Sequence, residues 1–309
     1  MKKLVCFLAG IVLITSFTQR KATGQQMNLI EKREVYDKEH IPKKDPIPYP
    51  FVREADVMWE KVIWRMINLR EKMNHPYYFP TKPIGDRKSL TSTLLEALSH
   101  PQPSHPVFAY QTLLNYEFEQ PINIEDVYKK LKADSIREPM IDSLTGQPVV
   151  NPITGRPVLK FTGVDIRLDD VTRLLVKEKW FFDRKYSSLQ VRIIGICPMR
   201  VFPMSITDQV TGMTVLTGDI NQQLLFWVYY PEVRFYLARQ ETFNPNNDAQ
   251  PISFDDMFNQ RLFSSYIYKE SNVFNDRPIN SYAKGMDAMF ESERVKQSIF
   301  EYEHDLWEY

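Results

Sequence analysis

Cysteine is scarce in this sequence of 309 residues, which holds only Cys6 and Cys197. Cys6 lies in an apolar N-terminal run whose features predict its removal, so Cys197 alone cannot form an intramolecular disulfide. Cys197 follows residues rich in β-formers and precedes a proline, which predicts a buried, unreactive thiol at the end of a strand. An intermolecular disulfide is the alternative in an oxidising compartment.

Glycine is also sparse, with 10 residues and no cluster among them, which argues against a backbone cradle for phosphate. The motifs G-x-S-x-G, H-E-x-x-H, the P-loop and G-x-G-x-x-G are absent. Three of the five histidines precede proline, and His100 and His105 have no cysteine or paired acid beside them. The acid pairs at 169–170 and 255–256 fall at predicted helix starts, where they complement the dipole. We therefore expect no catalytic residue, no metal and no cofactor.

Long hydrophobic runs are missing after the first residues. The apolar run Leu4–Phe17 follows two lysines, is too short to span a bilayer comfortably, and precedes a small-residue site. This pattern predicts a signal peptide of residues 1–24, cleaved near Gly24/Gln25, with an uncleaved anchor as the alternative. Cys6 lies at the wrong end of the run for lipidation. Acidic and basic residues balance at 39 each, which does not favour nucleic-acid binding.

Proline and aromatic residues alternate between residues 25 and 52. Pro46, Pro48 and Pro50 alternate with Ile47, Tyr49 and Phe51, a spacing that favours an extended, polyproline-like arm. A solvated tail has no use for aromatic side chains. We therefore expect the arm to dock on a neighbour or on its own body, with a flexible tail as the alternative.

Residues 54–74 carry apolar residues at helical spacing and predict an amphipathic helix. One broad face comprises Trp59, Val62, Ile63, Met66, Ile67, Leu69 and Met73. Trp64 and Val57 lie on the opposite side, which leaves two interpretations: cover by the same chain, or contact with a partner protein. The later run WFFD is interpreted as packing with a turn aspartate, or as a binding patch. The candidate partner-contact residues are Val57, Trp64, Tyr49, Phe51, Trp180, Phe181 and Phe182.

The remaining pattern predicts an α+β fold, with a mostly antiparallel sheet flanked by amphipathic helices. Further helices are expected at 89–98, 124–132, 170–180, 253–269 and 286–309. Strands are expected at 107–118, 164–168, 189–196 and 223–230. The repeat DSLTGQPVV–NPITGRPVL at 142–159 and the run DQVTG at 208–212 predict hairpin turns. The domain then spans 53–309, with a possible sub-boundary near 135–160.

Several segments in order resemble the GldN/PorN family of gliding-motility and type IX secretion proteins of the Bacteroidetes. These segments are DVMW at 56–59, WR at 64–65, LREKMNHPYYFP at 69–80, WFFD at 180–183 and VRIIGI at 191–196. The resemblance implies a periplasmic protein, peripherally associated with the outer membrane. It implies self-association in a ring with a GldK/PorK-like outer-membrane lipoprotein, and contact with a GldM/PorM-like component of the inner-membrane motor.

The leading hypothesis is therefore a non-enzymatic scaffold subunit that acts in protein secretion through protein–protein interaction. A periplasmic ligand-binding module or a hydrolase with an unrecognised site is the alternative, and it predicts a deep pocket lined by convergent polar groups and perturbed acids. A surface adhesin is a third class, which requires passage across the outer membrane.

Overall fold

The computed structural model describes residues 40–112, 118–131, 137–139, 149, 159–161, 167–207, 214–244, 247 and 249–306. The chain divides into two compact units, Met1–Pro42 and Lys43–Tyr309. Of the first unit only residues 40–42 are described, and they belong to a turn. The predicted signal peptide lies outside the described residues, as do the run at 208–212 and, except for residues 149 and 159, the repeat at 142–159, where hairpin turns are predicted.

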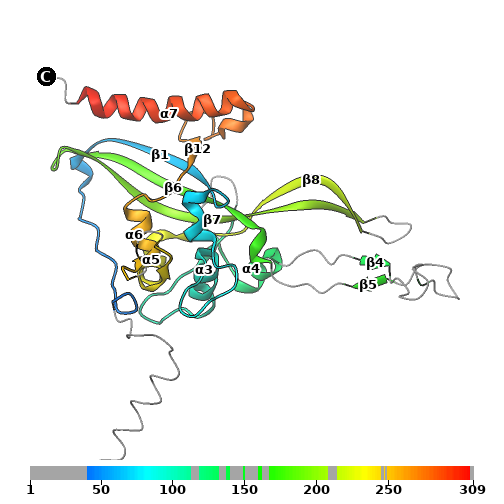
Figure 1. Cartoon of the computed structure of the whole chain (residues 1–309). Helices are drawn as coiled ribbons and strands as arrows, with labels where there is room; N and C mark the ends of the chain where they lie inside the picture. The colour runs from blue at the N-terminus through cyan, green and yellow to red at the C-terminus, as the bar shows by residue number, and fades with distance from the viewer. Residues whose placement is uncertain are drawn as a thin grey trace, which may run out of the picture. The chain divides into compact units, whose positions relative to one another are not determined.

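An antiparallel sheet forms the centre of the second unit (Figure 1). Among the described residues its strands follow the order β12-β1-β6-β7-β9-β2-β3, and β8 also pairs with β7. Their bounds are β1 Val57–Asn68, β2 Ala109–Tyr110, β3 Pro121–Ile122, β6 Val171–Asp183, β7 Ser188–Thr207, β8 Thr214–Leu224, β9 Trp227–Tyr229 and β12 Tyr266–Glu270. With helices packed against this sheet, the α+β prediction is confirmed.

The amphipathic helix predicted at 54–74 is wrong. After a short 3-10 turn, η1 (Glu54–Asp56), this segment forms strand β1. Strand β1 pairs with β6 on one side and with β12 on the other. Ile67 is buried in the main core, Ile63 in a cluster with Ile267 and Val295, and Trp64 and Met66 in a third cluster. A strand buried on both faces reads as a nearly continuous apolar run, in which helical spacing also finds matches.

The helix predicted at 170–180 is also wrong. After the 3-10 turn η3 (Leu168–Asp170), this segment forms strand β6 instead. The strand predicted at 223–230 is divided between β8 and β9, and the helix α5 (Tyr230–Arg239) that follows was not predicted. The helix expected at 253–269 ends early: α6 covers Phe254–Asn259, and the later residues form β12. Of the strand expected at 107–118, only β2 is found among the described residues.

Four other predicted helices or helix starts are confirmed. Helix α3 (Leu90–Ser99) is capped by the Ser89 side chain, which accepts a hydrogen bond from the Ser92 amide. Helix α4 covers Ile124–Leu131. Helix α6 begins with the predicted capping box between Ser253 and Asp256. The long C-terminal helix α7 covers Met286–Asp305.

Short elements connect these parts. They are η2 Lys72–Asn74, α2 His75–Tyr78, β4 Arg137–Pro139, β5 Leu159–Phe161, β10 Glu241–Thr242, β11 Ile252–Ser253 and η4 Ile279–Ser281. Strands β4 and β5, on either side of the 142–159 repeat, pair antiparallel. Strands β7 and β8 likewise pair antiparallel up to Thr207 and Thr214, on either side of the DQVTG run.

The main core lies between the sheet and helices α3, α4, α5 and α6, with Phe226, Tyr230, Phe254 and Phe258 among its fully buried side chains. A second cluster surrounds Cys197, whose side chain is completely buried as predicted. Its predicted position at a strand end is wrong, because β7 continues through Pro198 to Thr207. Gly195 in β7 is required by close packing, because a Cβ there would collide with the Phe118 ring and crowd the Val228 carbonyl.

Candidate docking surfaces

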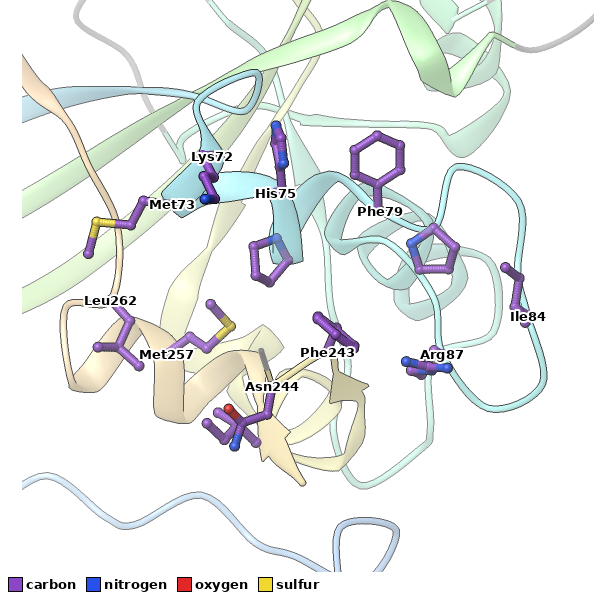
Figure 2. Close-up of a pocket in the computed structure, with 13 residues that line it drawn as sticks. Lys72, Met73, His75, Phe79, Ile84, Arg87, Phe243, Asn244, Met257 and Leu262 are labelled. Carbon is purple, nitrogen blue, oxygen red and sulfur yellow. The ribbon is translucent and has the colours of Figure 1, made fainter. Parts of the chain in front are cut away.

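An open apolar groove of about 920 Å³ lies where the segment after β1 faces the segments around α6. Figure 2 shows Lys72, His75 and Phe79 on one side of it, across from Met257, Phe243 and Asn244. The lining residues are Lys72, Met73, His75, Pro76, Phe79, Pro80, Ile84, Arg87, Phe243, Asn244, Ile252, Met257 and Leu262. The segment 72–80 is also the part of the sequence in which the family resemblance is densest.

Large hydrophobic side chains stand exposed around this groove. Met73, Phe79, Ile84 and Phe243 are 54%, 50%, 63% and 45% exposed. A cluster of exposed apolar side chains in a concave surface is typical of a protein-docking or ligand-binding site. The groove is therefore the strongest candidate for a functional surface in the part of the chain that the structure describes.

The polar groups that line the groove are few and mostly basic. Lys72 and Arg87 are cationic, and no aspartate, glutamate, serine or cysteine lines the cavity. His75 is held locally: its Nε2 donates to the Arg70 carbonyl (3.1 Å), and its ring meets Phe79 edge-on at 5.5 Å. An acid–base pair for catalysis is thus not among the lining residues. The lining suits an apolar ligand that carries negative charge at its edge.

Buried amides and hydroxyls fix the walls of the groove. The Asn74 side chain donates to the carbonyls of Asn68 (2.8 Å) and Ser264 (2.9 Å), and accepts from the Ser264 amide (2.9 Å). Thr242 Oγ1 donates to the Pro76 carbonyl at 2.9 Å. The bonds to Ser264 and from Thr242 join segments 190 and 166 residues apart, so the groove is a preformed feature of the fold.

A buried ion pair fixes α5 against α6, the helix that carries Met257. Arg234 donates two hydrogen bonds to Asp255, at 2.9 Å and 3.0 Å, and both side chains are almost inaccessible. Asp255 also accepts from the Tyr230 hydroxyl (2.8 Å) and from Asn259 (3.0 Å). Burial, followed by the neighbouring Asp255 carboxylate, raises the pKa of Tyr230 well above its usual value. The phenol stays a neutral donor.

The part of the predicted arm within the second unit lies along that unit's own surface. The Tyr49 ring contacts the guanidinium groups of Arg234 (4.2 Å) and Arg192 (5.1 Å), and Arg192 also donates to the Pro50 carbonyl. Lys44 forms an ion pair with Asp256 at 2.5 Å. Residues 43–53 therefore dock on their own body, which was one of the two expected outcomes.

Three of the seven candidate contact residues meet at a second cavity, of about 540 Å³, beside this arm. Tyr49, Val57 and Phe181 line it, together with the charged side chains Glu60 and Arg192. Phe51 projects from the arm and is 87% exposed. Arg192 contacts both the Tyr49 and Phe181 rings, so this surface is partly filled by the chain itself.

Trp64 is only 4% exposed and packs with Met66, Leu175 and Trp227. The Lys269 ammonium lies over its indole ring at 4.1 Å. The interpretation of Trp64 as part of an outward helical patch was wrong in its premise, because the segment is a strand. The chain itself covers this side chain, which leaves little of it for a partner.

Trp180 and Phe182 also serve internal packing. Trp180 is half-buried, and its indole Nε1 donates to Glu178 at 3.0 Å. Glu178 is fully buried and is neutralised by Arg65 (3.0 Å) and Arg261 (3.1 Å). Phe182 is 8% exposed. These contacts agree with the interpretation of the WFFD run as packing.

Helix α7 lies alongside β1 and β12 (Figure 1), and its two faces differ in burial. Val295 and Ile299 are buried against Ile63 of β1 and Ile267 of β12, and Trp59 stacks on Tyr302 at 4.7 Å. The opposite side is exposed although it is apolar, with four large side chains 58–66% exposed: Met286, Met289, Phe290 and Phe300. This outer apolar face has no cover among the described residues.

The groove and the outer face of α7 were not predicted from the sequence. The groove joins residues from 72 to 262, and no local pattern brings such distant segments together. The α7 face had a detectable signal in the sequence, since Met289 and Phe300 flank the apolar stripe that contains Val295 and Ile299. His100 and His105 lie elsewhere, and His105 stacks on Phe235 at 3.8 Å.

The described residues offer neither a metal-binding cluster nor a membrane-spanning helix. They contain no group of three or more His, Cys, Asp or Glu side chains placed to hold a metal ion. In the same residues no helix combines the length and apolarity needed to cross a membrane.

These features define an α+β protein with a preformed apolar groove and a two-faced terminal helix. The model of one protein family, described as gliding motility associated protein GldN, matches residues 52–308. The chain therefore belongs to the GldN family, which associates it with gliding motility. Comparison with curated proteins gives no match.

Proposed function

We propose that this chain is a non-enzymatic scaffold subunit of the type IX secretion and gliding-motility machinery. In this proposal it is exported to the periplasm and stays peripherally associated with the outer membrane. There it forms a ring complex with a GldK/PorK-like lipoprotein and contacts a GldM/PorM-like component of the motor. Membership of the GldN family supports the setting.

One structural observation supports a docking role in particular: the groove of about 920 Å³ is preformed, apolar and basic at its edge. Hydrophobic side chains exposed at 45–63% around a fixed concave surface supply the anchoring contacts that dominate protein interfaces. The alternative, a periplasmic ligand-binding module or hydrolase, predicts convergent polar groups and perturbed acids. The groove presents no carboxylate among its lining residues.

The test is isolation of the protein from native membranes without crosslinker, followed by identification of what co-purifies. We expect the lipoprotein and the motor component with the unaltered chain. An Ile84→Asp chain should retain at most about a tenth of them, a loss of about 1.4 kcal/mol or more in binding. A chain that elutes alone as a monomer in every preparation contradicts the proposal.

Ile84 is a suitable position because its backbone bonds do not depend on its side chain. It exchanges hydrogen bonds with Arg87 (3.0 and 3.1 Å) around a turn at Gly85, whose positive φ of 58° suits glycine. The matched control is Val273→Asp, which places the same charge on a β-branched residue that is 91% exposed away from the groove. This control should co-purify like the unaltered chain.

A further inference from the structure

The groove and the outer face of α7 are complementary surfaces of one chain. The ionisable residues that line the groove are Lys72, His75 and Arg87. Helix α7 carries six acidic residues and two basic ones, Arg294 and Lys296. Both surfaces expose large apolar side chains, and they share no residue. Opposite charge around matching apolar centres favours their association over random contacts.

The spacing on α7 fits a groove of this kind. At 100° per residue, Met286, Met289, Phe290 and Phe300 fall within an arc of about 100°, opposite the buried residues Val295 and Ile299. Met286, Met289 and Phe290 stand at i, i+3 and i+4, which is the anchor spacing of a helix bound in a hydrophobic groove. Methionine side chains adapt easily to an irregular apolar surface.

The occupant cannot be the helix of the same chain in its present position. The inner face of α7 is committed to β1 and β12, where Ser292 Oγ accepts a hydrogen bond from the Ile267 amide at 2.9 Å. Turning the outer face into its own groove would require unpacking Val295 and Ile299, which are 1% and 3% exposed. A neighbouring copy can present the same outer face without that cost.

We infer that copies of this chain associate head to tail, with the outer face of α7 from one copy bound in the groove of the next. Such a contact is heterologous, because two different surfaces meet. Heterologous contacts build closed rings when the rotation between copies closes, and open filaments when it does not. This inference rests on the proposed function for its biological setting, and it names a second copy as the occupant of the groove.

The test uses two variants of the purified chain, each of which disables one of the two surfaces. Ile84→Asp places a carboxylate in the groove, and Phe290→Asp places one on the outer face of α7, where the ring is 65% exposed. We expect the unaltered chain to form oligomers whose mass grows with concentration in analytical ultracentrifugation. Each variant alone should self-associate at least tenfold more weakly.

Mixing the two variants gives the decisive result. The Ile84→Asp chain still offers α7, and the Phe290→Asp chain still offers a groove, so one intact contact remains. The mixture should therefore form a 1:1 dimer that cannot grow further. Met289→Asp, at a position 63% exposed, serves as a second helix variant if Phe290→Asp melts at a lower temperature than the unaltered chain.

Three results would overturn the inference: a mixture that stays monomeric, variants that assemble like the unaltered chain, or a purified chain that is monomeric at all concentrations. If the purified chain is monomeric at all concentrations, the groove variant Ile84→Asp decides whether the proposed function still stands. Loss of lipoprotein or motor binding by monomeric Ile84→Asp would identify a different protein as the occupant, and the proposed function would stand. Unimpaired binding by that variant would show that the groove takes part neither in self-association nor in binding of the lipoprotein or motor component.

Discussion

The buried ion pair between Arg234 and Asp255 should determine how firmly the groove is held. Both side chains are almost inaccessible, and the pair joins α5 to the helix that carries Met257. Asp255→Leu leaves the Arg234 guanidinium buried without its partner, and the Tyr230 hydroxyl without an acceptor. Breaking a buried pair from one side costs about 3–5 kcal/mol. For a domain of this size each kcal/mol lowers Tm by about 2–4 °C, so the expected fall is about 6–20 °C.

A double-mutant cycle separates the interaction energy of the Arg234–Asp255 pair from the other effects of each substitution. Arg234→Met should also be destabilising, because among the described residues it leaves the buried Asp255 carboxylate with Tyr230 and Asn259 alone as donors. The double variant, Arg234→Met with Asp255→Leu, removes both charges and should cost much less than the two single changes added together. We expect a coupling energy of at least about 2 kcal/mol.

Urea unfolding followed by tryptophan fluorescence measures these free energies, because Trp64 and Trp227 are buried and report on the core. The reasoning is refuted if Asp255→Leu costs less than about 1 kcal/mol, or if the single changes add in the double variant. Additivity would mean that the 2.9 Å and 3.0 Å hydrogen bonds contribute nothing specific to the folded state.

Three further predictions concern other parts of the fold. Trp64→Ala should lower the free energy of unfolding by about 3–5 kcal/mol, because it empties a buried site; unchanged stability with lost partner binding would restore Trp64 as a contact residue. Ile299→Ala should cost about 2–5 kcal/mol and expose α7 to proteolysis, and protection equal to that of the unaltered chain would argue against its packing on β1 and β12. Burial opposes ionisation of Asp256, but hydrogen bonds from Lys44 and Ser253 outweigh it and lower its pKa. The unfolded state then binds more protons, so this contribution to stability is present above about pH 4 and is lost as pH falls through the lowered pKa. Asp256→Asn should flatten the pH dependence in that window, and an unchanged slope would count against the ion pair.

The helices with local signals could be predicted from the sequence. Ser89 and the Ser253–Asp256 capping box mark helix starts by their own chemistry, and α7 has a clear buried stripe. The predicted buried thiol at Cys197 also followed from its local context. Such signals act within one or two turns, so no knowledge of the tertiary fold is needed to read them.

The central strands could not be identified in this way. In β1, Trp59, Ile63 and Ile67 are spaced by four, which matches a helix and also the alternation of a strand. Strand β6 contains leucine, lysine and glutamate, which favour helices, but pairing on both sides overrides that preference. The groove is lined by segments that are far apart in the sequence. Its prediction therefore required the sheet topology that brings these segments together, which the local pattern alone did not provide.

The proposed function requires that the groove binds protein. The most direct test measures which proteins co-purify with the unaltered chain, with Ile84→Asp and with Val273→Asp. Each chain is expressed at equal level and isolated from native membranes without crosslinker. Quantitative mass spectrometry should show the lipoprotein and motor component with the first and third chains, and at most a tenth of them with Ile84→Asp. Equal recovery with all three chains would contradict the claim.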